Sequence, residues 1–432
     1  MKRFIIALLL AVSFCTTAQA ASYYVCDTAE NTGSDSNDGS LANPWLTASK
    51  AIQEISALDG GDNLYFCEGY DETSTANDFI ESSGTCDEAT PCTIDKYTPS
   101  GQDAGDDGVL PKITNTTYNV LQFDAATLQD GGYVFNNLHL VGDSSTNCVD
   151  IASGFSNVTF NTVTFDSCAI GVDITVIADE VSIGIDVIDG TWTNVTDIGY
   201  RGSSTRGSIQ GGTMTNVGNS TSDHAILLRG IDTSDFTVKN ITITDTAIVS
   251  TACSSPVIQA EGSFRGLYFT EVHVNETQAT AAAACIGILL DGDYGAEAAH
   301  FNYVQFAKVT TAWTGTSGIA CANCTNVYMD HNIVIGDDAI TTGIDIPYGT
   351  ESGVTSNYVD IYKTYMVLIG NDTGRTGIRA DVAKGSFTKN QIFENDTDDV
   401  CWERTSGIDL DDNLCWNSVV GGLDPSTNTV TN

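Results

Sequence analysis

The amino-acid sequence predicts an all-β protein: a right-handed parallel β-helix solenoid of about ten to eleven coils with a short N-terminal capping helix. Two observations support the solenoid, because apolar anchors, often in a Gly-Ile pair, recur every 29 residues or so, and a second apolar series recurs about every 28. One amphipathic helical segment before the repeats supports the cap. The first series is Val120, Val149, Val172, Ile198, Ile226, Val257, Ile288, Ile319, Ile344, Ile378 and Ile408. The second is Leu138, Val163, Trp192, Met214, Ile241, Val272, Val304, Ile333, Val359 and Ile392.

Each repeat is interpreted as strand, turn, strand, turn, and it is too short to contain a crossover helix. One such unit cannot bury its apolar residues, whereas a stack of units buries them in a continuous core. Side chains alternate along a strand, so Ile344 and Ile346 are expected inside and Asp345 outside. The alternative, an antiparallel β-sandwich, fits a constant period of this length poorly. Residues 109–432 are therefore predicted to form the solenoid.

Residues 1–20 have the pattern of a secretory signal peptide. Lys2 and Arg3 form the basic start, residues 4–14 the apolar core, and residues 18–20 a small-residue cleavage site. This apolar core is too short for a membrane-spanning helix, which needs about 20 apolar residues. No later segment could span a membrane. The mature protein is expected to be secreted, outside the cell, on its surface or in the periplasm.

Residues 21–108 are predicted to form an N-terminal cap and a loop-rich segment. Residues 23–25 and 63–67 have strand patterns, and Pro44 suits the first position of a helix that ends at Gly60 and Gly61. A stacked-strand protein exposes an apolar end with unpaired backbone groups, so this helix is expected to act as a lid. Its apolar face consists of Trp45, Ala48, Ile52, Ile55 and Leu58, at spacings of three and four.

The chain is strongly acidic, with 17 Lys and Arg against 56 Asp and Glu and a formal net charge of -39. Such a field repels nucleic acid, anionic membrane and acidic polysaccharide unless a divalent cation bridges them. No nucleic-acid partner is therefore expected. A solvated surface suited to salty water is one interpretation of the charge. Binding of Ca²⁺, the one cofactor considered, is the other.

The cysteine count predicts disulfides, because thirteen cysteines less Cys15 of the signal leave an even number in an exported chain. Proximity in sequence suggests the pairs Cys26–Cys67, Cys86–Cys92, Cys148–Cys168, Cys253–Cys285, Cys321–Cys324 and Cys401–Cys415. The spacing of Cys321 and Cys324 also fits half of a zinc site or a redox pair. No second such motif and no βαβ pattern accompanies it, which favours a structural disulfide.

Two groups of motifs resemble a known superfamily. The segment YYVCDTAENTGSDSNDGSLANPW, the helix after it and GGDNLYFCEG are similar to the start of pectate-lyase-like right-handed β-helix proteins, and the later GI-x-L and N-x-V/I-x-I/F strands resemble their coils. The resemblance covers nearly all of the mature chain and implies the fold. It implies no single function, because this fold hosts polysaccharide lyases, glycoside hydrolases, epimerases, tailspikes and adhesins. Similar proteins often continue beyond a coil such as DNLCWNSVVGG into a C-terminal cap, so the solenoid is expected to be incomplete at Asn432.

The residue after each first-series anchor is expected to point outward, which gives a column along the solenoid. The predicted column is Leu121, Asp150, Asp173, Gly199, Leu227, Ile258, Leu289, Ala320, Asp345, Arg379 and Asp409. Its middle is apolar, with Leu227, Ile258 and Leu289 as candidate substrate-binding residues. Cover by a long loop, contact with a partner, and a surface for an uncharged glycan are the alternatives.

The charged end of the column is a candidate metal and catalytic site. Asp345, Arg379 and Asp409 are expected on consecutive coils, with Asp381 and Asp411 two residues further along their strands. Stacked carboxylates could hold Ca²⁺, which takes about six to eight oxygen ligands. The resemblance implies a role for Arg379, since β-helix lyases use an arginine or lysine to remove the proton α to a calcium-bound uronate. The alternative is a ladder of salt bridges between coils.

A second candidate site is the segment GDDAI at residues 336–340. It resembles the GDD segment of polygalacturonase-type hydrolases, which implies catalytic roles for Asp337 and Asp338. Two carboxylates about 6.5–9.5 Å apart suit an inverting hydrolase. However, the third aspartate of that family is absent near Ser317, and so are its Gly-His-Gly and Arg-Ile-Lys motifs.

The leading hypothesis is an exported bacterial β-helix protein that acts on or binds polysaccharide or cell-surface glycan. Calcium-assisted lyase chemistry around Arg379 is its most concrete form. The alternative is a non-catalytic adhesin or extracellular structural protein that can associate with itself, favoured by the missing catalytic signatures, the disulfides and the charge. An inverting hydrolase of polygalacturonase type is the third hypothesis.

Overall fold

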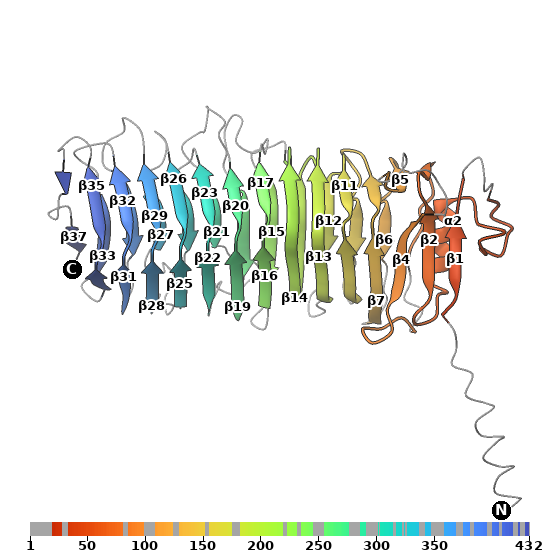
Figure 1. Cartoon of the computed structure of the whole chain (residues 1–432), viewed down its shortest axis with the longest axis horizontal. Helices are drawn as coiled ribbons and strands as arrows, with labels where there is room; N and C mark the ends of the chain where they lie inside the picture. Colours follow the sequence, from red (N-terminus) through yellow and green to blue (C-terminus); the bar gives the residue numbers. More distant parts are fainter. Residues whose placement is uncertain are drawn as a thin grey trace, which may run out of the picture.

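The computed structural model describes residues 20–27, 33–80, 85–98, 109–123, 129–151, 155–174, 182–218, 223–230, 235–244, 255–275, 286–290, 301, 303–313, 317–321, 324, 326–336, 342–346, 358–368, 375–380, 384–394, 400–405, 408–417, 422–423 and 428–431. Its strands stack along one long axis, and nearly all of their pairings are parallel (Figure 1). The predicted parallel β-helix is confirmed. The predicted signal peptide lies outside the described residues, except for its last residue.

Each coil has three strands rather than the two that the repeat predicted. One coil consists of β24 (Ser317–Cys321), β25 (Asn326–Asp330) and β26 (Ile333–Gly336), and the next of β27 (Thr342–Ile346), β28 (Tyr358–Tyr362) and β29 (Tyr365–Leu368). Corresponding strands pair in parallel, so each coil contributes to three sheets. The last two strands of a coil are separated by only two residues, which is why they read as one apolar run in the sequence.

The first sheet contains β6 (Leu121–Phe123), β9 (Val149–Ile151), β12 (Ile170–Ile174), the start of β14 (Ile198–Thr215), β15 (His224–Gly230), β18 (Ile258–Gly262), β21 (Ile286–Leu290), β24, β27, β30 (Thr376–Ala380), β33 (Val400–Thr405) and β37 (Asn428–Thr431). The second sheet contains β1 (Ser22–Val25), β2 (Asn63–Cys67), β4 (Cys92–Tyr97), β7 (Gln129–Asn136), β10 (Phe155–Asn161), β13 (Ser182–Thr193), the middle of β14, β16 (Asp235–Lys239), β19 (Gly266–Thr270), β22 (Val304–Ala307), β25, β28, β31 (Lys384–Thr388) and β34 (Ile408–Asp411). The third sheet contains β3 (Asp71–Ser74), β5 (Lys112–Asn115), β8 (His139–Val141), β11 (Thr164–Asp166), the ends of β13 and β14, β17 (Thr242–Thr244), β20 (His273–Asn275), β23 (Thr310–Trp313), β26, β29, β32 (Gln391–Glu394) and β35 (Leu414–Asn417), which pairs with β36 (Gly422–Leu423).

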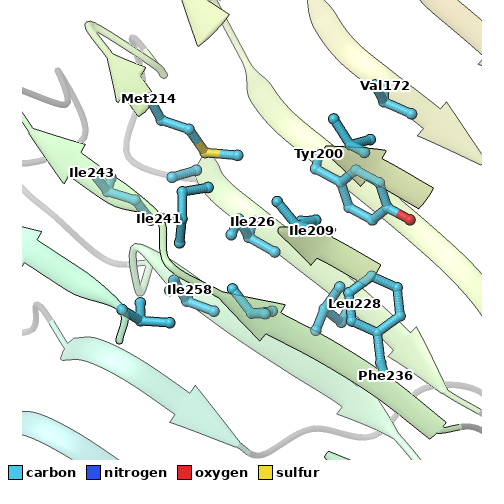
Figure 2. Close-up of a cluster of buried hydrophobic side chains, with 14 of the residues drawn as sticks. Val172, Tyr200, Ile209, Met214, Ile226, Leu228, Phe236, Ile241, Ile243 and Ile258 are labelled. Atoms are coloured by element: carbon cyan, nitrogen blue, oxygen red, sulfur yellow. The ribbon is translucent and has the colours of Figure 1, made fainter. Parts of the chain in front are cut away.

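The inward residues of the three sheets form one continuous apolar core. Along the first sheet, Ile226, Ile258 and Ile288 stack directly on one another and are fully buried. Tyr200 of the first sheet packs against Phe236 of the second, with ring centroids 5.8 Å apart (Figure 2). Each fully buried side chain of this size contributes about 1.5–3 kcal/mol. The stack therefore provides the buried apolar core that a single coil cannot form.

The register corrects part of the predicted apolar series. Ile408 lies in the second sheet opposite Gly385, whereas the first-sheet partner of Ile378 is Trp402. Within the second series, Val304 and Val359 belong to the second sheet, but Met214 and Ile392 belong to the third. Ile333 is 37% exposed rather than buried. The loops between strands differ in length, so a nearly constant step along the sequence crosses from one sheet to another.

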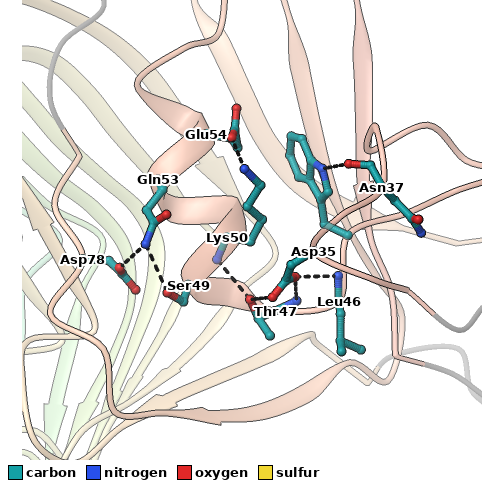
Figure 3. A network of polar contacts seen from close by, with 10 residues as sticks. Asp35, Asn37, Leu46, Thr47, Ser49, Lys50, Gln53, Glu54 and Asp78 are labelled. Atoms are coloured by element: carbon teal, nitrogen blue, oxygen red, sulfur yellow. Dashed lines mark hydrogen bonds and ion pairs between the residues drawn. The ribbon is translucent and has the colours of Figure 1, made fainter.

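The capping helix α2 (Ala48–Ile55) lies at the N-terminal end of the stack (Figure 1). It begins after Thr47, not at Pro44, because the backbone of Trp45 instead bonds to β1 through Tyr24 and Cys26. The Oγ1 of Thr47 accepts from the Lys50 N–H at 3.1 Å, and Asp35 accepts from the backbone of Leu46 and Thr47 (Figure 3). An N-cap of this kind contributes about 1 kcal/mol.

The buried face of α2 closes the apolar end of the stack. Ala48, Ala51, Ile52 and Ile55 belong to the same buried cluster as the solenoid core. The Gln53 amide on another side of the helix reaches Asp78 at 2.9 Å (Figure 3). Within the described part of the chain, no helix is long and apolar enough to cross a bilayer.

Among the residues that the structure describes, five disulfides form. They are Cys26–Cys67, Cys86–Cys92, Cys148–Cys168, Cys321–Cys324 and Cys401–Cys415, each of them a pair that sequence proximity suggested. Cys253 and Cys285 lie outside the described residues. Because Cys321 and Cys324 are bonded to each other, their thiolates are not available as zinc ligands.

A buried polar ladder supports the corner between the second and third sheets in the later coils. Asn332 and Asn390 are fully buried there. The Asn390 side chain accepts from the Thr364 N–H at 2.9 Å and donates to the Ile361 carbonyl at 3.0 Å. Asn332, which lies two coils before Asn390, makes the corresponding bonds to Val309 and Phe306 of the coil that precedes its own. These amides satisfy backbone groups that the turn would otherwise leave unpaired.

Replacing Asn390 with leucine should therefore destabilise the protein. The change leaves the Thr364 N–H and the Ile361 carbonyl without their side-chain partner, at a cost of roughly 2–5 kcal/mol. Urea unfolding followed by circular dichroism measures the loss. As the matched control, Gln391→Leu alters an exposed neighbour and should stay within about 0.5 kcal/mol of the parent. Equal stability of the two variants would contradict the role of the ladder.

Candidate functional site

The outward column of the first sheet follows from the strand register. It consists of Gln122, Asp150, Asp173, Arg201, Leu227, Gln259, Leu289, Ala320, Asp345, Arg379, Glu403 and Thr429. The predictions for Leu121, Gly199, Ile258 and Asp409 are wrong. The first three lie one or two residues before the column residue of their strand, and Asp409 lies in the second sheet. Gln122, Arg201, Gln259 and Glu403 take those places.

The predicted apolar surface does not form as one stripe. Ile258 is fully buried in the solenoid core, so it cannot contact a substrate. Leu227 points outward but is only 4% exposed, since it belongs to a small separate cluster with Ile170 and Ile198. Leu289 is half-buried. These burials favour the interpretation in which the middle of the column is covered.

Arg379 and Asp345 lie together, as predicted from their order in the column. The guanidinium donates from Nε to Asp345 Oδ1 at 2.7 Å and from Nη2 to Oδ2. Asp345 is largely buried, with a side chain 15% exposed. A guanidinium held this way stays protonated, because arginine keeps its charge in proteins and the carboxylate favours the charged form. The pair can orient an anionic group, but it does not favour Arg379 as a general base.

The other predicted ligands of a metal site are not brought to this pair. Asp409 and Asp411 lie in β34 of the second sheet, opposite Ser386 and Thr388, so their predicted place beside Arg379 is wrong. Asp337, Asp338 and Asp381 lie outside the described residues. Within the part that the structure describes, no three side chains of His, Cys, Asp or Glu gather closely enough to hold a metal ion.

A second arginine pair lies near the other end of the column. Arg201 donates to Asp173 from Nε at 2.7 Å and from Nη2 at 2.6 Å. The Asn147 amide also donates to this carboxylate at 3.1 Å. The hydrogen bonds from Arg201 to Asp173 raise the pKa of Arg201. The arrangement balances a nearly buried carboxylate with three donors.

Titratable groups that the sequence did not point out gather at the starts of β14 and β15. Asp197 precedes β14 and Asp223 precedes β15, and the next residues, Ile198 and His224, are partners in the register. The two aspartates therefore occupy equivalent places on adjacent coils, whose strands are about 4.8 Å apart. Burial, followed by the nearby charge of Asp223, raises the pKa of Asp197.

His224 adds a neutral base to this cluster. Its Nδ1 lies 2.8 Å from the carbonyl oxygen of Pro256, which can only accept, so Nδ1 carries the proton. Burial lowers the pKa of His224 and keeps its ring neutral at neutral pH. A carboxyl group with a raised pKa beside a neutral imidazole is suited to acid–base chemistry. In the sequence, each aspartate directly precedes one of two residues that pair in the register, Ile198 and His224. This pattern can be recognised only once the register is known.

Aromatic side chains form a second exterior feature, which we call the tyrosine track: Tyr268, Tyr303, Tyr328 and Tyr358. The rings lie on consecutive coils at the second sheet and are half-buried. Successive ring centroids are 5.6, 5.0 and 5.9 Å apart. Outward polar residues Gln305 and Asp360 lie beside Tyr328 on the neighbouring strands. The track is thus an aromatic strip with hydrogen-bonding groups next to it.

Comparisons with known proteins find similar solved structures but no matching sequence family. Neither a protein-family model nor a curated protein sequence matches this chain. The GH136 lacto-N-biosidase from Eubacterium ramulus shares 9% identity at a TM-score of 0.48 over 81% of this chain. A rhamnogalacturonan lyase shares 13% at 0.47, covering 86% of this chain and 87% of its own, and XylC in complex with xylose shares 9% at 0.49, covering 91% and 86%. This chain spans 65% of the lacto-N-biosidase chain. Identities and scores this low carry no argument about function.

The raised pKa of Asp197 predicts a pH-dependent effect of Asp197→Asn. The native state holds this proton above the unfolded pKa of about 3.9, so its contribution to stability is lost as pH rises through the folded pKa. The variant should therefore gain thermal stability relative to the parent between acid and neutral pH, and the difference should vanish below about pH 3.9.

Asp143→Asn is the matched control for this measurement. Hydrogen bonds from Ser145 lower the pKa of Asp143, so its removal should cost stability at neutral pH. Melting curves from pH 3 to pH 8 (about one point per unit) should thus move in opposite directions for the two variants. A parallel response of both would show that the environment of Asp197 does not disfavour its charge.

Proposed function

We propose that this chain binds an extended polysaccharide along its second sheet, with the tyrosine track as the contact surface. The observation that carries the proposal is the series of four half-buried rings, 5.0–5.9 Å apart along the axis of the solenoid. That step is close to the length of one sugar residue in an extended chain. The C–H faces of sugar rings are apolar and pack on aromatic rings, as other apolar ligand surfaces do.

Polar residues beside the track supply partners for sugar hydroxyls. Tyr358 donates to Asp360 at 2.8 Å, and Ser386 donates to the other oxygen of this carboxylate at 2.6 Å. Asp360 is held in place by these bonds, and Gln305 lies across from Tyr328. Ring stacking between strands also stabilises a sheet without any ligand. The half-exposed faces and the adjacent polar groups favour a binding role in addition to that one.

The electrostatics fit a binding surface of this kind. The chain has a net charge of -39, and this charge does not repel a neutral glycan. An uncharged aromatic strip is therefore a suitable contact surface for such a ligand. Five disulfides support an exported location, where such glycans occur. A glycan-binding surface serves both an enzyme and an adhesin.

A second candidate function is acid–base cleavage of the bound glycan at the cluster of Asp197, Asp223 and His224. It is favoured by the raised pKa of Asp197, since a general acid must hold its proton near the working pH. The earlier hypothesis of calcium-assisted elimination at Arg379 stays a proposal with less support. Its arginine donates to Asp345 from Nε and Nη2, and two of its expected ligands lie in another sheet.

Replacing Tyr303 and Tyr328 together with alanine tests the track. Each aromatic contact is worth about 0.5–1.5 kcal/mol, so the double variant should bind about tenfold more weakly or worse. Affinity electrophoresis against xylan, galactan, β-glucan and polygalacturonate measures the change. Tyr65→Ala is the matched control, because Tyr65 stacks on Tyr24 at the far end of the same sheet. Unchanged binding by the double variant would contradict the proposal.

Turnover assays on the same glycans separate the catalytic candidates. Formation of reducing ends that is lost in Asp197→Asn and kept in Arg379→Ala would support acid–base cleavage. An ultraviolet-absorbing unsaturated uronide that disappears in Arg379→Ala would support elimination instead. We expect the first result if the chain is an enzyme, by at least about a hundredfold, the usual minimum effect of a general acid. Products that neither substitution affects would rule out both sites.

A further inference from the structure

A shallow groove lies at the corner between the second and third sheets in the later coils. Its volume is about 450 Å³. The residues that line it are Lys363, Thr364, Tyr365, Lys389, Gln391, Asp412 and Leu414. They come from the turns between β28 and β29, between β31 and β32, and between β34 and β35. The groove is thus built from three consecutive coils.

The lysines of the groove occupy an unfavourable backbone conformation. Lys363 and Lys389 have φ values of 51° and 57°, in the left-handed region that lysine rarely adopts. The same point of the turn holds Asn137 and Asn240 in two earlier coils and Thr162, Glu271 and Lys308 in others. The left-handed position is thus a regular feature of this turn, and it sets lysines on two adjacent coils at the groove.

Both ammonium groups converge on one aromatic ring. Nζ of Lys363 lies 4.8 Å from the centroid of Tyr362, and Nζ of Lys389 lies 5.9 Å from it. His331 contacts this ring edge-on, with centroids 5.9 Å apart. Two positive charges brought together in this way repel each other unless an anion lies between them. The groove therefore has a local preference for negative charge.

Four other lysines of the described residues form ion pairs with carboxylates: Lys50, Lys96, Lys112 and Lys308. Lys308, at the equivalent turn two coils before Lys363, pairs with Glu271 at 2.8 Å, and Lys112 pairs with Asp71 at 2.7 Å. Neither Lys363 nor Lys389 forms an ion pair with any residue that the structure describes. In a chain with 56 acidic residues against 17 basic ones, two lysines that meet at one aromatic ring are a distinct feature.

An exposed aromatic ring lies beside these charges. Tyr365 is 41% exposed and packs on Phe393, with ring centroids 5.4 Å apart. The exposed amide of Gln391 lies opposite Tyr365 in the register and offers both a donor and an acceptor. Asp412 closes one side of the groove with a negative charge. Such a site favours a ligand with one small ring and one anionic group. A ligand with charge spread evenly over its surface fits it less well.

We propose that this groove binds an anionic saccharide, with its ring on Tyr365 and its carboxylate or sulfate between Lys363 and Lys389. The inference rests on the proposed glycan-binding function and names the charge of the ligand at this point of the surface. It also removes the need for a bridging cation, because the two ammonium groups supply the positive charge. A long polyanion would be repelled by the rest of the surface, whereas a sugar chain with local negative groups meets favourable contacts here.

The test compares the parent with two variants for binding in EDTA at low ionic strength. Lys363→Asn with Lys389→Asn removes both charges and places a tolerated residue at each left-handed position, so this double variant should fold at least as well as the parent. It should bind polygalacturonate or a sulfated galactan about tenfold more weakly or worse, the effect of losing one or more charge-assisted hydrogen bonds. Binding by the parent should weaken as salt rises. Lys308→Asn, which removes the same charge at the same turn outside the groove, should bind like the parent.

The choice of probes separates the sources of the anion. Polygalacturonate supplies carboxylates, sulfated galactan supplies sulfates, and unsubstituted galactan supplies neither and should be insensitive to the lysines. Equal binding of acidic glycans by parent and double variant, or binding that requires Ca²⁺, would overturn the proposal. So would an equal dependence on these lysines with phosphatidylserine vesicles or oligothymidine. Loss of binding in the lysine variant but not in the tyrosine double variant would support the groove and reject the track, and the reverse result would do the opposite.

Discussion

Parallel hydrogen bonding between successive coils is the constraint on which this molecule depends. Each strand repeats the register of the strand before it, so a residue such as Asp345 lies directly beside Ala320 and Arg379 although it is far from both in sequence. Inside, this register stacks isoleucine on isoleucine and builds the core. On the outside, the same register stacks the outward side chains of successive strands into columns. The arginine pairs and the glycan surfaces proposed for this chain are all consequences of such columns.

The corner between the second and third sheets shows how one backbone geometry serves two purposes. Its left-handed residue turns the chain, and the next residue points inward, where Asn332 and Asn390 satisfy the backbone. The left-handed side chain itself points away from this ladder, so its identity can change without harm to the core. Asn137 and Asn240 occupy this position in two earlier coils, whereas Lys363 and Lys389 occupy it in two later ones. Structure is thus conserved along the solenoid while the chemistry of the surface changes.

Charge is organised locally in spite of the strongly acidic composition. Arg201 and Arg379 each donate two hydrogen bonds to one aspartate. The neighbouring carboxylates contribute to the local electrostatic field. Asp197 responds to that field and to burial by a raised pKa. The tyrosine track and the lysine pair of the groove interrupt the acidic surface. A ligand would meet aromatic and cationic groups at these places and carboxylates elsewhere.

The sequence by itself determined the fold class, because the alternation at Ile344–Ile346, the recurring Gly-Ile pairs and the apolar face of residues 48–55 depend only on local periodicity. It also brought Asp345 next to Arg379, since the loop between them did not disturb the repeat. Only the tertiary structure decided that Ile258 points inward and that Asp409 belongs to another sheet. The register depends on loop lengths that the average period conceals, and a slip of one residue reverses the face of a strand. Asp197 and Asp223, or Lys363 and Lys389, become neighbours only once that register is fixed.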